Sequence, residues 1–327
     1  MNKSFRIGWT GMCATIFLIA IWTTRPALAG AKAETRKNVV ATIAQIGQPL
    51  LEIAGGKAHV ITLIGDGVDP HLYRLTRSDV AKINRADIVF YNGLHFEAQM
   101  LDMLRRFAAH KPVLGIADTL KGKNLLLWDG KTHDPHVWMD PSLWARALQA
   151  AVNTLAKHDP ENADTYRVNA AAYFGKLHAL DAYTRTAVGS IPAASRALVS
   201  AHDAFGYFGR AYAIDVLAIQ GISTESKAGI RKIEALVDTL VQRRVSAVFV
   251  ETTVSPRNVR ALIKGASARG HTVRIGGALF SDAMGARDSY KGTYLGMFNH
   301  NVTTIVHALG GTTLAKDFGE KTSAEVN

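Results

Sequence analysis

Short runs of β-branched and other apolar residues alternate with longer helix-like segments, and this alternation restricts the fold more than any other feature of the chain. In the first half, the runs typical of buried strands are 39–43, 60–64, 87–91 and 113–116, with helical patterns at 48–54, 78–85 and 97–108. In the second half, we expect strands near 197–200, 215–219, 247–251 and 272–275. Strands separated by helices pair in parallel, because each crossover returns the chain to the same end of the sheet. We therefore predict an α/β protein with two parallel-sheet lobes.

One long helical pattern lies between the two halves. Asp159 is suited to an N-cap and Pro160 to the first helical position, and the pattern stops at Gly189 and Pro192. Apolar residues recur at spacings of three and four: Tyr166, Ala170, Tyr173, Leu177 and Leu180. A helix of about thirty residues would extend over roughly 45 Å, so we expect one rigid connector; an ordinary helix within a domain is the alternative. The predicted boundaries are 30–158 for the first lobe, 159–190 for the connecting helix and 191–327 for the second lobe.

The first 29 residues have the pattern of a signal peptide. Lys3 and Arg6 precede an apolar run, and 27–29 (ALA) matches the small residues of a cleavage site. A membrane anchor is the alternative, but the run ends short of the roughly 20 residues that span a bilayer. We therefore expect cleavage near Ala29 and a periplasmic protein. Cys13, the one cysteine, leaves with this segment, which excludes a disulfide framework and any cysteine-built metal site.

The formal charge of +11 does not indicate a nucleic-acid partner, because the basic residues are scattered and form no run of five or six. Catalytic and nucleotide-binding motifs are missing from the sequence as well. It has no GxxxxGK[ST] loop, no GxSxG nucleophile turn and no HExxH helix. We therefore predict a binding protein rather than an enzyme.

A tripeptide that occurs twice is the strongest functional signal. Asp69-Pro70-His71 follows a predicted strand, and Asp134-Pro135-His136 repeats the same residues. Proline fixes one backbone angle, so the histidine after it lies on a stiffened turn, and the aspartate can bind nearby amides or the spare imidazole proton. A lone loop histidine is usually a surface residue, but two on the same kind of turn predict metal ligands at His71 and His136.

Two further candidates come from the second half. His202 directly follows the predicted strand 197–200, and Asp282 follows the strand that we expect to end at Ile275. Ligands of parallel α/β sheets bind beyond the carboxyl ends of the strands, which is also where His71 falls. Three imidazoles and one carboxylate, two from each half, predict a tetrahedral metal site in the cleft between the lobes. Such a donor set suits zinc first.

These residues resemble the metal-binding periplasmic proteins of zinc and manganese ABC importers, the solute-binding family that includes ZnuA and TroA. The resemblance extends from Asn38 to Leu309, is strongest to the TroA-like branch, and is carried by the segments 69–71 (DPH), 134–140 (DPHVWMD), 200–208 (SAHDAFGYF) and 276–282 (GGALFSD). It implies two α/β lobes bridged by one long helix and a partner permease in the membrane. It also implies metal ligation by His71, His136, His202 and Asp282. We expect a monomer, and whether a metallochaperone loads the site stays open.

Two departures from the family bear on the metal. Many members proposed to be manganese-specific carry glutamate at the position of His202, which favours zinc here. Many zinc members have a histidine-rich loop where this chain has 121–132, a segment without histidine. We expect Zn(II), with Mn(II) as the alternative, delivered to an ABC permease. Because protons compete for the imidazoles, we expect affinity to fall as pH drops through about 6.5.

The main alternative function is a secreted zinc-dependent hydrolase. It would need three protein ligands, an open position for water, and a general base such as Glu251. Ligation by Asp282 distinguishes the two functions. In a binding protein, Glu251 has two interpretations: it is an outer partner of the metal site, or it caps the following helix. We expect His133 to be a solvated loop residue, and Trp138 and Phe205 to pack around the site.

Overall fold

The computed structural model describes residues 36–225 and 228–313. The predicted signal peptide and Cys13 therefore lie outside the described residues. Within them, no helix has both the length and the apolar character that a membrane span requires.

The N-terminal lobe is built on a four-stranded sheet with strand order β2-β1-β3-β4 and parallel pairing throughout. Its strands are β1 (Lys37–Ala41), β2 (Ala58–Thr62), β3 (Ile88–Tyr91) and β4 (Val113–Gly115). Its helices are α1 (Ala44–Ala54), α2 (Arg77–Arg85), α3 (Leu101–Ala108) and α4 (Pro141–His158). The sequence patterns located the four strands to within two residues at their starts, but they predicted no helix over 141–158. That helix begins with an Asp140 side chain that accepts the N–H of Leu143 at 3.0 Å, followed by Pro141.

The C-terminal lobe pairs β5 (Ala197–Ser200) with β6 (Asp215–Ala218) and β7 (Ala247–Glu251) with β8 (Arg274–Leu279), again in parallel, and β5 lies beside β7. Its helices are α6 (Gly206–Tyr212), α7 (Ile230–Gln242), α8 (Arg257–Ala268) and α9 (Tyr294–Ala308). The prediction of two parallel-sheet α/β lobes is confirmed.

Strand β8 continues four residues beyond Ile275, where we expected it to end, and the reason is the glycine pair Gly276-Gly277. A Cβ at Gly277 would lie 2.3 Å from Cγ2 of Thr304 on α9, and the φ of Gly277 is +150°. The two glycines thus let α9 pack closely on a strand whose pairing with β7 shifts register at Val248 and Phe249. Asp282 consequently follows the strand at a short distance.

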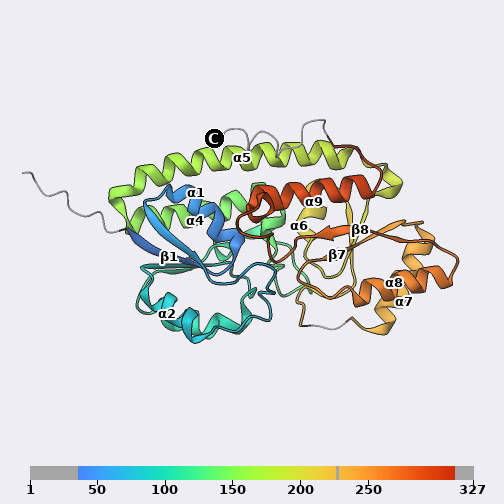
Figure 1. Cartoon of the computed structure of the whole chain (residues 1–327), viewed down its shortest axis with the longest axis horizontal. Helices are drawn as coiled ribbons and strands as arrows, with labels where there is room; N and C mark the ends of the chain where they lie inside the picture. Colours follow the sequence, from blue (N-terminus) through green and yellow to red (C-terminus); the bar gives the residue numbers. More distant parts are fainter. Residues whose placement is uncertain (1–35, 226–227, 314–327) are drawn as a thin grey trace, which may run out of the picture. The chain divides into compact units, whose positions relative to one another are not determined.

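The connector is α5 (Ala163–Gly189), a single helix of 27 residues, about 40 Å long. It packs against α1 and α4 in one lobe and against α6 and α9 in the other (Figure 1). The predicted N-cap at Asp159 is found on the 3₁₀ turn Pro160–Asn162, which leads directly into α5, although the Asp159 side chain caps no backbone N–H there. Because α4 extends to His158, Asp159 lies in the turn between two helices, and its carboxylate accepts bonds from Asn162 and the Tyr166 hydroxyl. The lobe boundaries at 158/159 and 190/191 stay predictions.

The buried core crosses from one lobe to the other. One cluster joins the four-stranded sheet, α4, α5 and α9 with the aromatic residues of α6. A second, smaller cluster lies between the C-terminal strands β5 and β7 and the helices α7 and α8. Tyr294 stacks with both Trp144 and Phe298, and its hydroxyl donates to the carbonyl of Trp138 at 2.6 Å. The two lobes are therefore fastened together close to the loops that carry the predicted ligands.

Candidate metal centre

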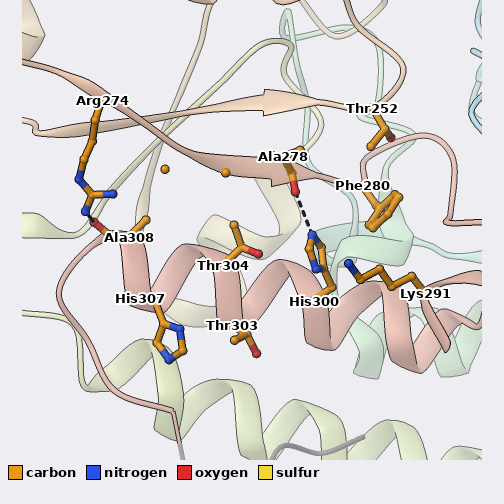
Figure 2. Close-up of a pocket in the computed structure, with 12 residues that line it drawn as sticks. Thr252, Arg274, Ala278, Phe280, Lys291, His300, Thr303, Thr304, His307 and Ala308 are labelled. Atoms are coloured by element: carbon orange, nitrogen blue, oxygen red, sulfur yellow. Dashed lines mark hydrogen bonds between the residues drawn. The ribbon is translucent and has the colours of Figure 1, made fainter.

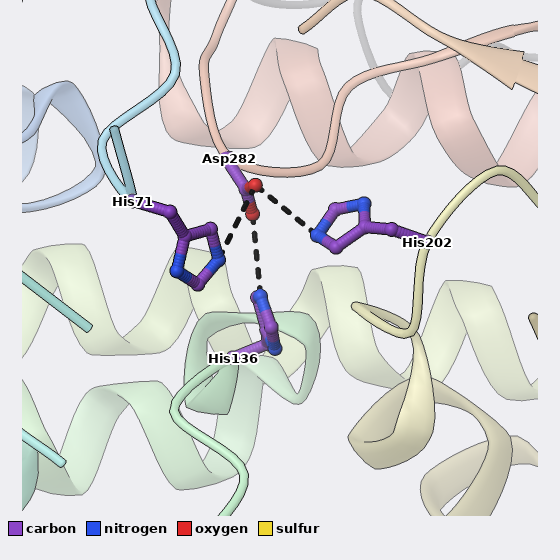
Figure 3. Close-up of side chains that lie close together, drawn as sticks. All are labelled: His71, His136, His202 and Asp282. Atoms are coloured by element: carbon purple, nitrogen blue, oxygen red, sulfur yellow. Dashed lines mark ion pairs between the residues drawn. The ribbon is translucent and has the colours of Figure 1, made fainter. Parts of the chain in front are cut away.

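The four predicted ligands come together although they belong to four separate loops (Figure 3). Asp282 lies at the centre of the cluster. Its carboxylate oxygens lie 3.1 Å from Nε2 of His202, 3.3 Å from Nε2 of His136 and 3.7 Å from Nε2 of His71. All four residues are buried, and one donor atom from each lies within 4.8 Å of the others. The arrangement places two residues of each lobe around one point.

Strand ends explain most of this convergence. His71 lies in the loop after β2, His202 directly after β5 and Asp282 shortly after β8, so these three side chains share the carboxyl ends of the parallel strands. His136 reaches the same place from the segment before α4, at the start of the 3₁₀ turn Val137–Met139.

Both Asp-Pro-His turns make the same backbone bond. Oδ1 of Asp69 accepts the N–H of His71 at 2.9 Å, and Oδ1 of Asp134 accepts the N–H of His136 at 2.9 Å. Asp134 also lies 2.8 Å from Nδ1 of His136, which leaves Nε2 free to face Asp282. The two turns therefore differ in one respect: one aspartate holds the backbone alone, while the other holds the backbone and the imidazole.

Glu251 has the corresponding role for His202. From the end of β7, one carboxylate oxygen accepts the N–H of His202 at 2.8 Å and the other lies 2.5 Å from Nδ1. Of the two interpretations made from the sequence, the outer partner is therefore the one that the geometry supports. Both oxygens of Glu251 are thus directed at His202, and Glu251 is not one of the four side chains of the cluster.

Five buried donor atoms at the centre of the cluster have no hydrogen-bond partner among the described residues. They are Nε2 of His71, His136 and His202 and both carboxylate oxygens of Asp282. Buried polar atoms are nearly always partnered, and these atoms have ion pairs between Asp282 and the histidines in place of hydrogen bonds. Five such atoms around one point are the arrangement that a bound cation completes.

The charges at the cluster are strongly perturbed. Burial lowers the pKa of His71 to about 3, against the attraction of Asp282. Burial acts in the same direction on His136, but Asp134 and Asp282 outweigh it and raise that pKa to about 9. His202 has a raised pKa because Asp282 and Glu251 likewise outweigh its burial. The histidines in turn overcome the effect of burial on Asp282 and hold its pKa well below the usual range. The centre thus holds a carboxylate that is already ionised and available to a metal.

Residues around the cluster fix it in place. Phe96 packs edge-on against His71, with ring centroids 4.6 Å apart. Trp138 packs against His136 and, beyond the predicted packing role, donates from Nε1 to the carbonyl of Ser281 at 3.0 Å. Gln45 donates to the carbonyl of Asp282 at 2.9 Å. Sequence reasoning missed Phe96 and Gln45; Gln45 lies just after β1, so the strand-end rule could have identified it.

The remaining predictions concern residues outside the cluster. His133 is exposed and forms an isolated backbone bridge with Leu127, as expected of a loop histidine. Phe205 is buried in the core, as expected of a packing residue.

A small cavity of about 10 Å³ lies beside Asp282 and is lined by none of the three histidines. A much larger open groove of about 570 Å³ lies between β8 and α9 and is lined by Arg274, Lys291 and His300 among others (Figure 2). None of the four candidate ligands lines that groove.

Comparison with known proteins agrees with this architecture. Residues 39–308 match the family described as "ZnuA: Zinc-uptake complex component A periplasmic". The chain is 43% identical to the manganese-binding lipoprotein MntA of Bacillus subtilis, over 86% of this chain and 92% of that protein. It is 40% identical to the zinc-binding protein TroA of Treponema pallidum, over 91% of this chain and 98% of that protein.

Solved structures lead to the same family. The periplasmic zinc-binding protein TroA of Treponema pallidum superimposes with a TM-score of 0.82 at 42% identity, covering 84% of this chain and 99% of that one. Fe(III)-bound YtgA of Chlamydia trachomatis has a TM-score of 0.77 at 27% identity, with coverage of 84% and 99%. These relatives are metal-binding proteins rather than enzymes. The chain therefore belongs to the ZnuA family, the extracytoplasmic metal-binding proteins that serve ABC transporters.

Proposed function

We propose that this protein captures Zn(II) outside the cytoplasm through His71, His136, His202 and Asp282 and delivers it to an ABC permease. The observation that carries this proposal is the set of five buried donor atoms that face one another without a hydrogen-bond partner among the described residues. Three imidazole nitrogens and a carboxylate are a donor set that zinc binds readily in tetrahedral geometry. The family membership supplies the permease as the partner. Residues 1–29 would direct export and be removed near Ala29.

The choice of zinc depends on His202. Imidazole at this position gives three nitrogen donors, and Mn(II) favours sites with more oxygen. Mn(II) stays the alternative metal for a specific reason: Asp282 turns both oxygens toward the histidines, with Oδ1 closest to His136 and Oδ2 closest to His202. A carboxylate bound through both oxygens would give five donors, which accommodates the harder ion. Relatives named for zinc and for manganese are similarly close in sequence, so the donor set carries the preference.

Two features favour a carrier over a zinc-dependent hydrolase. The base that a hydrolase would need, Glu251, has both oxygens bound to His202. The four candidate ligands are all buried, so the centre has no side that is open to a substrate from solvent. A carrier needs neither a general base nor an open position for a substrate, because it only binds the metal and later releases it.

Elemental analysis tests the proposal directly. The mature protein is purified from its native compartment, and zinc and manganese are both counted per chain. We expect one equivalent of zinc and little manganese, and a competition titration of the metal-free protein should give the same preference. One equivalent of manganese would overturn the choice of metal, and a chain that binds neither ion would overturn the function.

A further inference from the structure

The four candidate ligands are not held equally firmly. His136 and His202 are each fixed at Nδ1 by a carboxylate of their own lobe, Asp134 and Glu251 respectively. The loop of Asp282 is held through two of its carbonyls, by Gln45 and by Trp138. In the part of the chain that the structure describes, no carboxylate is bonded to Nδ1 of His71. The imidazole of His71 is instead held by edge-on packing against Phe96.

His71 is also the ligand nearest to solvent. Its exposed fraction is 4%, against 0% for His136 and His202 and 1% for Asp282. Its loop is exposed on both sides of the buried Pro70-His71 pair: residues 65–68 are exposed, and Leu72 is 51% exposed. A metal that leaves the centre by breaking one bond first would therefore lose His71 first.

The Asp69 side chain connects the backbone of this ligand to the opposite lobe. Oδ1 of Asp69 accepts the backbone N–H of His71, and Oδ2 accepts the hydroxyl of Thr224 at 2.6 Å. Thr224 belongs to the segment between β6 and α7 in the C-terminal lobe. The same loop makes a second contact with that lobe, where Oδ2 of Asp66 accepts the N–H of Arg287 at 2.9 Å. Because Asp66 is exposed, water competes for its bond with Arg287. Asp66 does not bond to His71, so this contact acts only on the start of the loop.

We propose that the Asp69–Thr224 hydrogen bond is a latch that positions His71 and sets how long the metal is retained. The proposal rests on the proposed function, because it takes His71 as a ligand. With the latch closed, the Asp69 carboxylate is held from both sides and keeps the backbone of His71 fixed toward Asp282. With the latch open, the exposed loop is free to carry the imidazole away. Thr224 is thus a positioning residue that acts through Asp69 and does not touch the metal.

The test is Thr224→Val, which keeps the shape of threonine and removes the donor. Zn(II) loaded at one equivalent is chased with excess chelator, and the release rate is followed by stopped flow. We expect release to become about five- to tenfold faster, as for the loss of one partly buried hydrogen bond. Thr224→Ser keeps the hydroxyl and should release zinc at the wild-type rate.

A matched control comes from Glu225, the residue next to Thr224. Nε2 of Gln99 donates to Oε1 of Glu225 at 2.7 Å, which also joins the two lobes but does not hold His71. Gln99→Ala should leave the release rate unchanged. A Thr224→Val protein that binds one equivalent and releases it at the wild-type rate would overturn the latch, as would equal acceleration by Gln99→Ala. A wild-type protein that binds no zinc would instead overturn the proposed function, so the two failures are distinguishable.

Discussion

Glu251 holds His202 at two points, because one carboxylate oxygen accepts the backbone N–H and the other lies 2.5 Å from Nδ1. Glutamine at this position keeps the shape but has only one acceptor oxygen, so one of the two contacts would place two donors against each other. We expect Glu251→Gln to weaken zinc binding by about 10- to 100-fold, the usual effect of losing such a partner. Competition with a chromophoric chelator measures this. Glu234→Gln, an exposed glutamate on α7, is the control and should bind as wild type.

The sequence could predict that His202 lies in the cluster of candidate ligands, but not the identity of its partner. A histidine after a parallel strand is recognisable from local pattern, because strand ends share one edge of the sheet. Glu251 stands 49 positions away at the end of another strand, and only the packing of β5 beside β7 decides whether it reaches His202 or the next helix. The repeated Asp-Pro-His turns could likewise be recognised from the sequence alone. The contact of Asp69 with Thr224 of the other lobe could not, because it depends on tertiary structure.

The fold shows the same division. Strand positions followed from short apolar runs, but the extension of β8 through Gly276-Gly277 runs against local propensity and depends on α9 packing close above it. Asp159 is the N-cap of the 3₁₀ turn before α5, as predicted, but its carboxylate accepts from the Asn162 and Tyr166 side chains, and the patterns did not reveal that α4 extends to the residue before it. Local chemistry therefore predicted most elements and the four side chains of the cluster, and tertiary packing decided where the elements end and which residues contact the cluster.

Removal of a central ligand should cost far more than removal of a nearby histidine. Structural sites bind zinc with a free energy of about 10–16 kcal/mol. The loss of one of four ligands therefore corresponds to a loss of roughly 100-fold or more in affinity. We expect this loss for His136→Ala, which also leaves Asp134 buried without its imidazole. His133→Ala, three residues away and exposed, should bind zinc as wild type. Equal losses in the two variants, measured by the same titration, would refute the assignment of ligands.

Zinc binding should release protons even at pH values well above the ordinary pKa of histidine. In the metal-free protein the pKa of His136 is about 9, so this imidazole is protonated at neutral pH and must lose its proton to bind metal. Affinity should therefore rise as pH rises toward about 9, a higher window than the 6.5 expected from an unperturbed histidine. His71, with a pKa of about 3, contributes no proton there. Titration calorimetry at pH 7.5 in two buffers of different ionisation enthalpy measures the protons released, and a value of zero would contradict the prediction.

The thermal stability of the metal-free protein should fall as pH rises, whereas the zinc affinity should rise. A histidine whose pKa is raised from 6.5 to about 9 on folding contributes stability that is complete below pH 6.5 and is lost as pH rises through 9. In the zinc-bound protein the imidazole is already neutral and bound, so this loss should be absent. The difference in melting temperature between the zinc-bound and metal-free forms should therefore widen from pH 6.5 to pH 9. Calorimetric scans of both forms measure it, and a constant difference would show that His136 does not titrate in this way.

Two buried tryptophans offer a matched test of how the Asp282 loop is held. Trp138 donates from Nε1 to the carbonyl of Ser281, whereas Nε1 of Trp144 is buried without a hydrogen-bond partner among the described residues. Phenylalanine at either position keeps an aromatic ring and removes the donor. Trp138→Phe should leave the Ser281 carbonyl with only a longer contact of 3.4 Å from Gln45, lower the free energy of unfolding by about 1 kcal/mol and weaken zinc binding severalfold.

Trp144→Phe loses no bond, so its zinc affinity should equal that of the wild type, although the smaller ring leaves a packing defect that also lowers the free energy of unfolding. The comparison thus separates stability from binding: both variants are expected to unfold more easily, and only Trp138→Phe should lose affinity. Chemical denaturation gives the first quantity and chelator competition the second. If affinity falls in both variants in proportion to stability, the Trp138–Ser281 bond has no specific part in placing Asp282.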